Sequence, residues 1–203
     1  MKLFASLTSP YARKIRVILH EKQLPFELVV DSPWESNTLI PSVNPLGKVP
    51  VLITDDEEVY FDSPLIAAWL ETLDAPPRLL PADRLEALRV QRTEALADGI
   101  NDAAVHAFLE SRRPGGERSD AVIARQHAKI ERALDHLEAQ AGGHTWLHGD
   151  DITLADIAVG IALGYLDLRI SDLDWRRAHP ALAGLAERLF TRPSFIDTLP
   201  PAG

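Results

Sequence analysis

The chain has 203 residues, 46% of them hydrophobic and 25% charged, which is typical of a globular protein with a substantial core. Its 30 acidic residues outnumber 21 basic ones, and no dense Lys/Arg cluster occurs, so we expect no nucleic-acid partner. The absence of cysteine excludes disulfides, thiolate metal ligands and a protein-thiol nucleophile. The chain has no apolar run of the ~20 residues that span a bilayer and no signal-peptide pattern, which predicts no membrane partner and a cytoplasmic location.

Strand and helix patterns alternate over the first third of the chain. In order, we expect a strand at 2–6, a helix at 10–22, a strand at 26–31, loops with one short helix at 32–46, hairpin strands at 49–54 and 59–61, and a helix from 64 to 73. The acidic residues 55–58 are expected to form the solvated tip of this hairpin. The predicted order is βαβαββα, a small α/β domain with a mixed sheet.

The remainder of the chain is predicted to be helical. The Pro-rich segment within 76–84 is expected to link residues 1–75 to an all-helical domain at 85–203. Its helices are expected at 85–113, from beyond the Pro-Gly-Gly break at 114–116 to 141, from 153 through 166, and at 181–190.

Two Ser-Pro pairs, Ser9-Pro10 and Ser63-Pro64, each follow a predicted strand. In both, the serine suits the N-cap of a helix and the proline its first position, so both are explained by capping alone. Two helix N-termini at a common edge would also form a site for anionic groups.

The run NPLGKVPVL, residues 44–52, places a proline inside an apolar strand-like segment. Because proline lacks a backbone donor, Pro50 is expected at the start or edge of a strand. A cis Val49-Pro50 bond would expose the backbone of Val49 to a peptide ligand, although trans is the commoner isomer.

These motifs together resemble the glutathione S-transferase family, specifically a cytosolic, bacterial-type member with a serine-type active site. The resemblance rests on SPYARKIR after the first strand, NPLGKVPVL, the Asp62-Ser63 pair, and, in the second half, ITLADI (152–157) and the C-terminal HPAL and RPSF. It implies an N-terminal thioredoxin-like domain, a C-terminal all-helical domain, a homodimer and glutathione as co-substrate, with no metal.

The resemblance also implies roles for individual residues. Ser9 would be catalytic, donating a hydrogen bond to the glutathione sulfur, and Thr8 is the alternative donor. Val49 would pair with the cysteinyl moiety, with Pro50 cis, and Lys48 would meet the glycyl carboxylate. Ser63 would bind the γ-glutamyl carboxylate and Asp62 the γ-glutamyl ammonium, although Glu or Gln is more usual there.

The acceptor side is less specified by the sequence. Tyr11, Ile100, Ala104 and Phe108 are candidate pocket residues, although residues of these types in such positions are more often plain core or interface. Thr153 and Asp156 are interpreted as a structural capping box rather than a catalytic pair.

The resulting hypothesis is an enzyme of detoxification that conjugates glutathione to a small hydrophobic electrophile. Glutathione-dependent peroxidase or isomerase activity would use the same thiolate. The alternative from another class is a non-catalytic or regulatory protein that keeps the fold.

Overall fold

The computed structural model describes residues 1–201, which divide into two compact units. The first unit comprises Met1–Leu79 and the segment from Arg192 onward, and the second comprises Leu80–Thr191. This division differs from the predicted helical domain at 85–203 because the C-terminal segment packs against the first helix of the chain.

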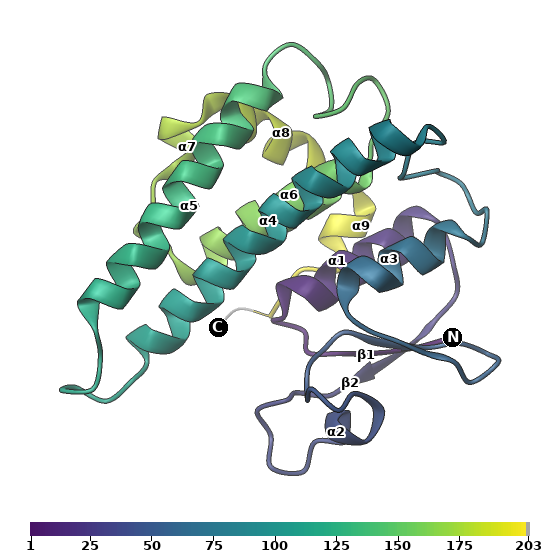
Figure 1. Cartoon of the computed structure of the whole chain (residues 1–203), viewed down its shortest axis with the longest axis horizontal. Helices are drawn as coiled ribbons and strands as arrows, with labels where there is room; N and C mark the ends of the chain where they lie inside the picture. Colours follow the sequence, from purple (N-terminus) through teal and green to yellow (C-terminus); the bar gives the residue numbers. More distant parts are fainter. Residues whose placement is uncertain (202–203) are drawn as a thin grey trace. The chain divides into compact units, whose positions relative to one another are not determined.

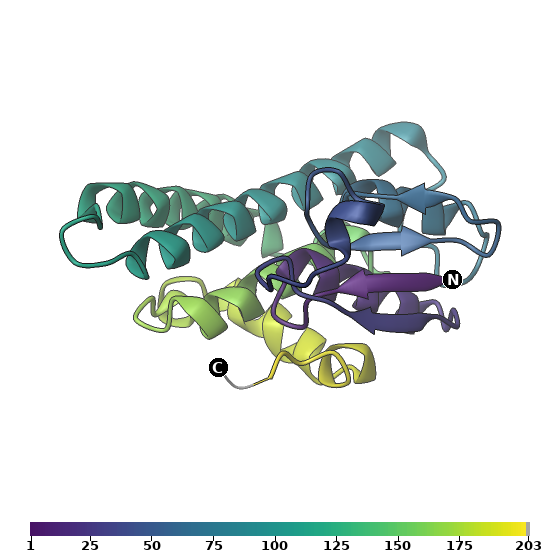
Figure 2. The same ribbon diagram turned by 90° about the horizontal axis from the view of Figure 1, so that it is seen from below.

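The first unit is built on a four-stranded mixed sheet with the order β2-β1-β3-β4 (Figures 1 and 2). The strands are β1 (Lys2–Ala5), β2 (Glu27–Val30), β3 (Val51–Ile53) and β4 (Val59–Tyr60). β1 is parallel to β2 and antiparallel to β3, and β3 is antiparallel to β4. The mixed sheet and the βαβαββα order are as predicted.

Helices lie on both sides of this sheet. α1 (Pro10–Glu21) and α3 (Ser63–Glu71) cover one face, and the short α2 (Ile40–Val43) lies on the other side (Figure 1). α1 buries Ile15, Ile18 and Leu19, whose spacing of three and four residues gives the helix its apolar face.

The C-terminal segment is held to α1 by buried arginines. Arg13 Nη2 donates to the Phe195 carbonyl (3.1 Å), and Arg16 Nη1 donates to the Thr198 carbonyl (3.3 Å). At the far end of α1, Arg192 contacts Glu21 through two hydrogen bonds (2.8 and 2.7 Å). The short helix α9 (Pro193–Ile196) in this segment was not predicted from the sequence.

The second unit contains the long helices α4 (Arg84–Ser111), α5 (Asp120–Ala141) and α6 (Leu154–Arg169). α6 is almost fully buried and packs against α4, and α8 (Pro180–Phe190) packs against α5 and α6. The short α7 (Trp175–Ala178) precedes α8 and was also missed by the sequence pattern. No strand belongs to this unit among the residues that the structure describes, as predicted.

Asp156, in the first turn of α6, organises the start of that helix. Its carboxylate accepts from the Thr153 amide (2.8 Å), the Thr153 hydroxyl (2.8 Å) and the Leu147 amide (2.7 Å). Asp156 is fully buried, and burial raises its pKa although these hydrogen bonds oppose the shift. Its position at a helix start, with its acceptors occupied, supports a structural role.

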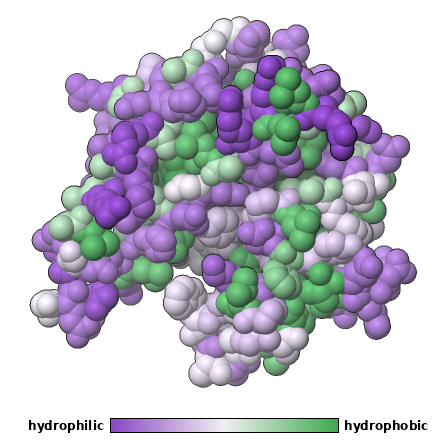
Figure 3. All heavy atoms as spheres, in the orientation of Figure 1, coloured by the Kyte–Doolittle hydropathy of each residue, from purple (hydrophilic) through white to green (hydrophobic). Residues whose placement is uncertain are grey.

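The surface in Figure 3 is mostly hydrophilic, and its hydrophobic residues form separate patches. Within residues 1–201, every helix is too short or too polar to cross a bilayer.

Candidate active site

Ser9 is the N-cap of α1. Its Oγ accepts a hydrogen bond from the Ala12 amide (3.3 Å), and its extended backbone is the usual N-cap conformation. Because a hydroxyl can accept and donate at once, this bond leaves the Ser9 proton available to a ligand atom at the positive end of α1. Thr8, the alternative donor, lies 3.4 Å from Ser6, measured between the two hydroxyl oxygens.

The backbone of Val49 is presented by a structured loop. Val49-Pro50 is a cis peptide, as the resemblance implied, and β3 begins immediately afterwards at Val51. Among residues 1–201, neither the amide nor the carbonyl of Val49 has a hydrogen-bond partner. These two groups can therefore pair with an extended peptide-like ligand.

Asn44 holds that loop, and the sequence interpretation gave it no role. Its side chain is 1% exposed and donates to the Lys48 carbonyl (2.9 Å) while accepting from the Leu46 amide (2.9 Å). Gly47, at φ +61°, adopts a left-handed conformation that glycine reaches without steric cost. An asparagine before Pro45 in a Gly-containing segment is a recognisable turn signal that could have drawn attention to this residue.

The start of α3 differs from the prediction. Ser63 is the first helical residue rather than the N-cap, and Asp62 occupies the cap position without bonding the helix through its side chain. The Ser63 side chain is buried, and its hydroxyl has no hydrogen-bond partner within the described range. The exposed Asp62 carboxylate likewise has none there. Asp62 follows Phe61 through a cis peptide.

The sheet register brings these segments to one edge. Phe4 at the end of β1 pairs with Val51 at the start of β3, and Tyr60 at the end of β4 pairs with Leu52. Ser9 follows β1, Val49-Pro50 precedes β3, and Asp62-Ser63 follows β4. The Ser9 hydroxyl, the unpaired backbone groups of Val49 and the N-terminus of α3 therefore lie at the same edge of the sheet. The exposed Lys48 adds a positive charge there.

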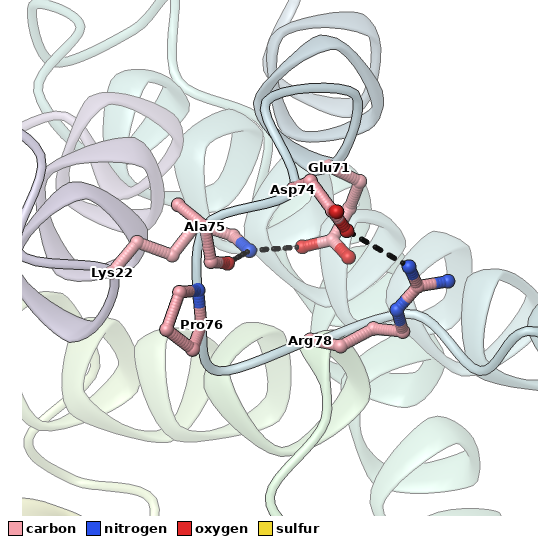
Figure 4. Close-up of a pocket in the computed structure, with 6 residues that line it drawn as sticks. All are labelled: Lys22, Glu71, Asp74, Ala75, Pro76 and Arg78. Carbon is pink, nitrogen blue, oxygen red and sulfur yellow. Dashed lines mark hydrogen bonds and ion pairs between the residues drawn. The ribbon is translucent and has the colours of Figure 1, made fainter.

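A pocket of about 160 Å³ lies elsewhere in the first unit, between the ends of α1 and α3 (Figure 4). The Lys22 ammonium donates to the carbonyls of Ala75 and Pro77 (2.8 Å each) and pairs with Glu71 (2.8 Å). All three ammonium donors are used in this way, so the cluster anchors the chain that leaves α3.

The candidate acceptor residues belong to different units. Tyr11 is a partly exposed residue of α1, whereas the other three lie on α4 in the second unit. There Ile100 and Ala104 are buried, and Phe108 is partly exposed.

Comparisons with known proteins match both units. The N-terminal domain model of glutathione S-transferases matches residues 8–73, and the C-terminal domain model matches residues 120–188. The GST-like protein YibF of Escherichia coli is 44% identical over 99% of each chain. The chain belongs to the glutathione S-transferase family.

Two solved glutathione S-transferases place ligands on this fold. The enzyme of Methylobacterium radiotolerans, in complex with glutathione sulfonate, is 46% identical with a TM-score of 0.94, covering 100% of this chain and 95% of that one. The enzyme of Methylobacillus flagellatus, with glutathione bound, is 43% identical with a TM-score of 0.94, covering 98% of each chain. The predicted fold class is thus confirmed: a thioredoxin-like glutathione S-transferase domain precedes a helical one.

Proposed function

We propose that this protein is a glutathione transferase that binds glutathione at the shared edge of its sheet and conjugates it to a small hydrophobic electrophile. The observation that carries the proposal is the register that gathers Ser9, Val49 and Ser63 at one edge. Family membership and the two glutathione-containing relatives support it.

In the proposed site the cysteinyl backbone and the charged groups of glutathione have partners of matching chemistry. The Val49 amide and carbonyl pair with the cysteinyl backbone, with cis Pro50 shaping the turn. The Ser63 hydroxyl and the α3 N-terminus bind the γ-glutamyl carboxylate, and Asp62 binds the γ-glutamyl ammonium. The exposed Lys48 ammonium faces the glycyl carboxylate.

Ser9 is the proposed catalytic residue. A free thiol has a pKa near ~8.5, and a hydroxyl donor at a helix N-terminus stabilises the thiolate. The thiolate forms a C–S bond with the electrophilic carbon, and the leaving group departs with the bonding electron pair. The thiol proton passes to solvent. Tyr11, Ile100, Ala104 and Phe108 are proposed to line the acceptor side.

We further propose a cytoplasmic homodimer with a role in detoxification. Leu85 and Leu88 on the first turns of α4 are 58% and 61% exposed, which supports coverage of this helix by a second copy. Light scattering coupled to gel filtration measures the assembly, and a Leu85→Glu, Leu88→Glu double variant should run as a monomer.

Calorimetric titration with glutathione, followed by conjugation assays with electrophilic aryl halides, tests the function. We expect binding at millimolar glutathione or below, and release of halide in proportion to thioether formed. Absence of binding at millimolar glutathione would reject the proposal. Binding without turnover across several electrophiles, including hydroperoxides, would favour a regulatory protein that keeps the fold.

A further inference from the structure

Phe108, on the last turn of α4, has two arginine side chains of the second unit close to its ring. The guanidinium carbon of Arg169 is 4.3 Å from the centre of the Phe108 ring, and that of Arg112 is 5.8 Å from it. Arg112 is the C-cap of α4, and Arg169 is the last residue of α6. Two helix ends therefore concentrate two positive charges around one partly exposed aromatic ring.

Other arginines that stack on rings in this protein also have acceptors for their N–H groups. Arg176 stacks on Trp175 and donates to both oxygens of Asp167 (2.6 Å each). Arg13, over Phe195, bonds the Phe195 carbonyl, and Arg188, over Trp146, bonds the Thr145 carbonyl. Stacking uses the face of a guanidinium and leaves its in-plane donors to be satisfied by hydrogen bonds.

Among residues 1–201, neither Arg112 nor Arg169 has a carboxylate or backbone-carbonyl acceptor for its side chain; the side-chain acceptor of Arg169 is the Tyr165 hydroxyl. Over residues 1–201, neither guanidinium has a carboxylate within ion-pair distance, although the chain has nine more acidic than basic residues. The Nε of Arg169 is buried without a hydrogen-bond partner in the same range. The Tyr165 hydroxyl bonds Arg169 but supplies no negative charge, since burial raises its pKa further above the ordinary value of 10.0.

The attraction of a cation to a helix C-terminus helps to place both arginines, but it does not occupy their in-plane donors. The Trp175, Arg176 and Asp167 cluster shows what is missing at Phe108, namely a carboxylate that accepts from a stacked guanidinium. Such bonds between guanidinium and carboxylate are among the stronger ones in proteins.

We propose that Phe108, Arg112 and Arg169 form a binding site for the carboxylate of a small organic acid with an apolar frame, and that this acid is the acceptor substrate. The assignment of the acid as acceptor rests on the proposed transferase function. Phe108 contacts the apolar frame, and the two guanidinium groups bind the carboxylate. The site thus selects anionic electrophiles over neutral ones.

A matched pair of acceptors tests this selectivity. 4-Chloro-3,5-dinitrobenzoate and its methyl ester both form a C–S bond with glutathione and release chloride, but one carries a carboxylate. The ratio of kcat/KM for the acid to kcat/KM for the ester should fall about tenfold or more in Arg169→Met and Arg112→Met. Arg177→Met removes an exposed charge on α7 and should leave the ratio unchanged. An unchanged ratio in both test variants would overturn the proposal.

A binding experiment separates this proposal from the transferase function. 3,5-Dinitrobenzoate has no leaving group, so calorimetry can measure its binding without turnover. Wild-type protein should bind it, Arg169→Lys should bind it more weakly because lysine lacks the planar fork, and Arg112→Met should bind it weakly or not at all. If neither acceptor is conjugated but these differences hold, the acid site stands and the transferase function fails. Equal binding by all three proteins would refute the site, whatever the activity. The exposed Arg112 keeps the test valid if Arg169 variants fail to fold.

Discussion

The side-chain amide of Asn44 donates to the carbonyl of Lys48 across 2.9 Å and so fixes the loop that delivers Val49 to the edge of the sheet. Asn44 also accepts from the Leu46 amide, so one buried side chain replaces two backbone bonds that a regular element would supply. Asn44 therefore positions the backbone groups of Val49 that are proposed to bind glutathione, without needing to contact glutathione itself.

Asn44→Ala should raise the Kd for glutathione but should change the pKa of the bound glutathione thiol little. Loss of a typical hydrogen bond costs about 1 kcal/mol, so the Kd should rise roughly fivefold. Calorimetry measures the Kd, and ultraviolet difference spectra measure the pKa of the bound thiol. Ser42→Ala, at an exposed hydroxyl of the same segment, is the control. Unaltered affinity in Asn44→Ala would contradict this role of the loop.

Ser9→Ala should raise the pKa of the thiol of bound glutathione. A hydrogen bond to a charged group contributes about 1.5–3 kcal/mol, which corresponds to an upward shift of roughly one to two pKa units. The thiolate absorbance of the complex at neutral pH should fall, while the Kd for glutathione changes little.

Loss of the N-cap should also lower the free energy of unfolding of Ser9→Ala by about 1 kcal/mol. Ser9→Thr retains the hydroxyl and should retain most of the thiolate. A Thr8→Val variant provides the comparison, because an effect there with none at Ser9 would assign the donor to Thr8.

Asp156→Ala should damage folding rather than chemistry. The substitution leaves the buried amides of Thr153 and Leu147 without their acceptor, and each unpaired group costs about 1–3 kcal/mol. Thermal unfolding should show a lower Tm, while the activity per folded molecule persists. A variant that keeps its Tm and loses turnover would make Asp156 functional instead.

Acid should weaken the attachment of the C-terminal segment through Glu21. Burial raises the pKa of Glu21, but hydrogen bonds from Arg192 and Ser194 outweigh burial and hold it below its ordinary value of 4.5. A lowered folded-state pKa means that this contribution is complete above about pH 4.5 and is lost as pH falls through the folded-state pKa.

The free energy of unfolding should therefore differ between wild type and Glu21→Gln at pH 7, and the difference should shrink below pH 4. Denaturant titrations at several pH values measure it. Glu35→Gln, at an exposed carboxylate, should show no comparable trend. A difference that is constant from pH 7 to pH 3 would mean that the Glu21 charge is irrelevant to the attachment.

Local signals in the sequence were sufficient for most of the fold. The helical spacing of Ile15, Ile18 and Leu19 predicted the buried face of α1, and Ser9-Pro10 predicted its cap. At α3 the same reasoning misplaced the cap by one residue. Asp62 and Ser63 are both favourable N-cap types, and proline is tolerated at either of the next two positions, so the pattern does not distinguish them.

Long-range backbone contacts had no such signal. Arg13 and Arg16 bond carbonyl groups near the end of the chain, and every residue has a carbonyl, so nothing in residues 193–198 marks them as acceptors. The two arginines near Phe108, neither of which has a carboxylate partner among residues 1–201, likewise come from two helix ends that are distant in sequence. The proposed glutathione site was easier to predict from the sequence, because its residues lie directly before or after strands within the first 63 positions.

Because the last residues pack against α1, the N-terminal unit cannot complete its packing until the end of the chain has been synthesised. A ribosome releases the sheet and its helices early, but the partners of Arg13, Arg16 and Glu21 emerge after nearly all of the chain. Until then these buried positions on the nascent N-terminal unit are open to water and to chaperones. A fragment ending at Leu79 would lack the same cover permanently, so the isolated unit should be less stable than its place early in the chain suggests.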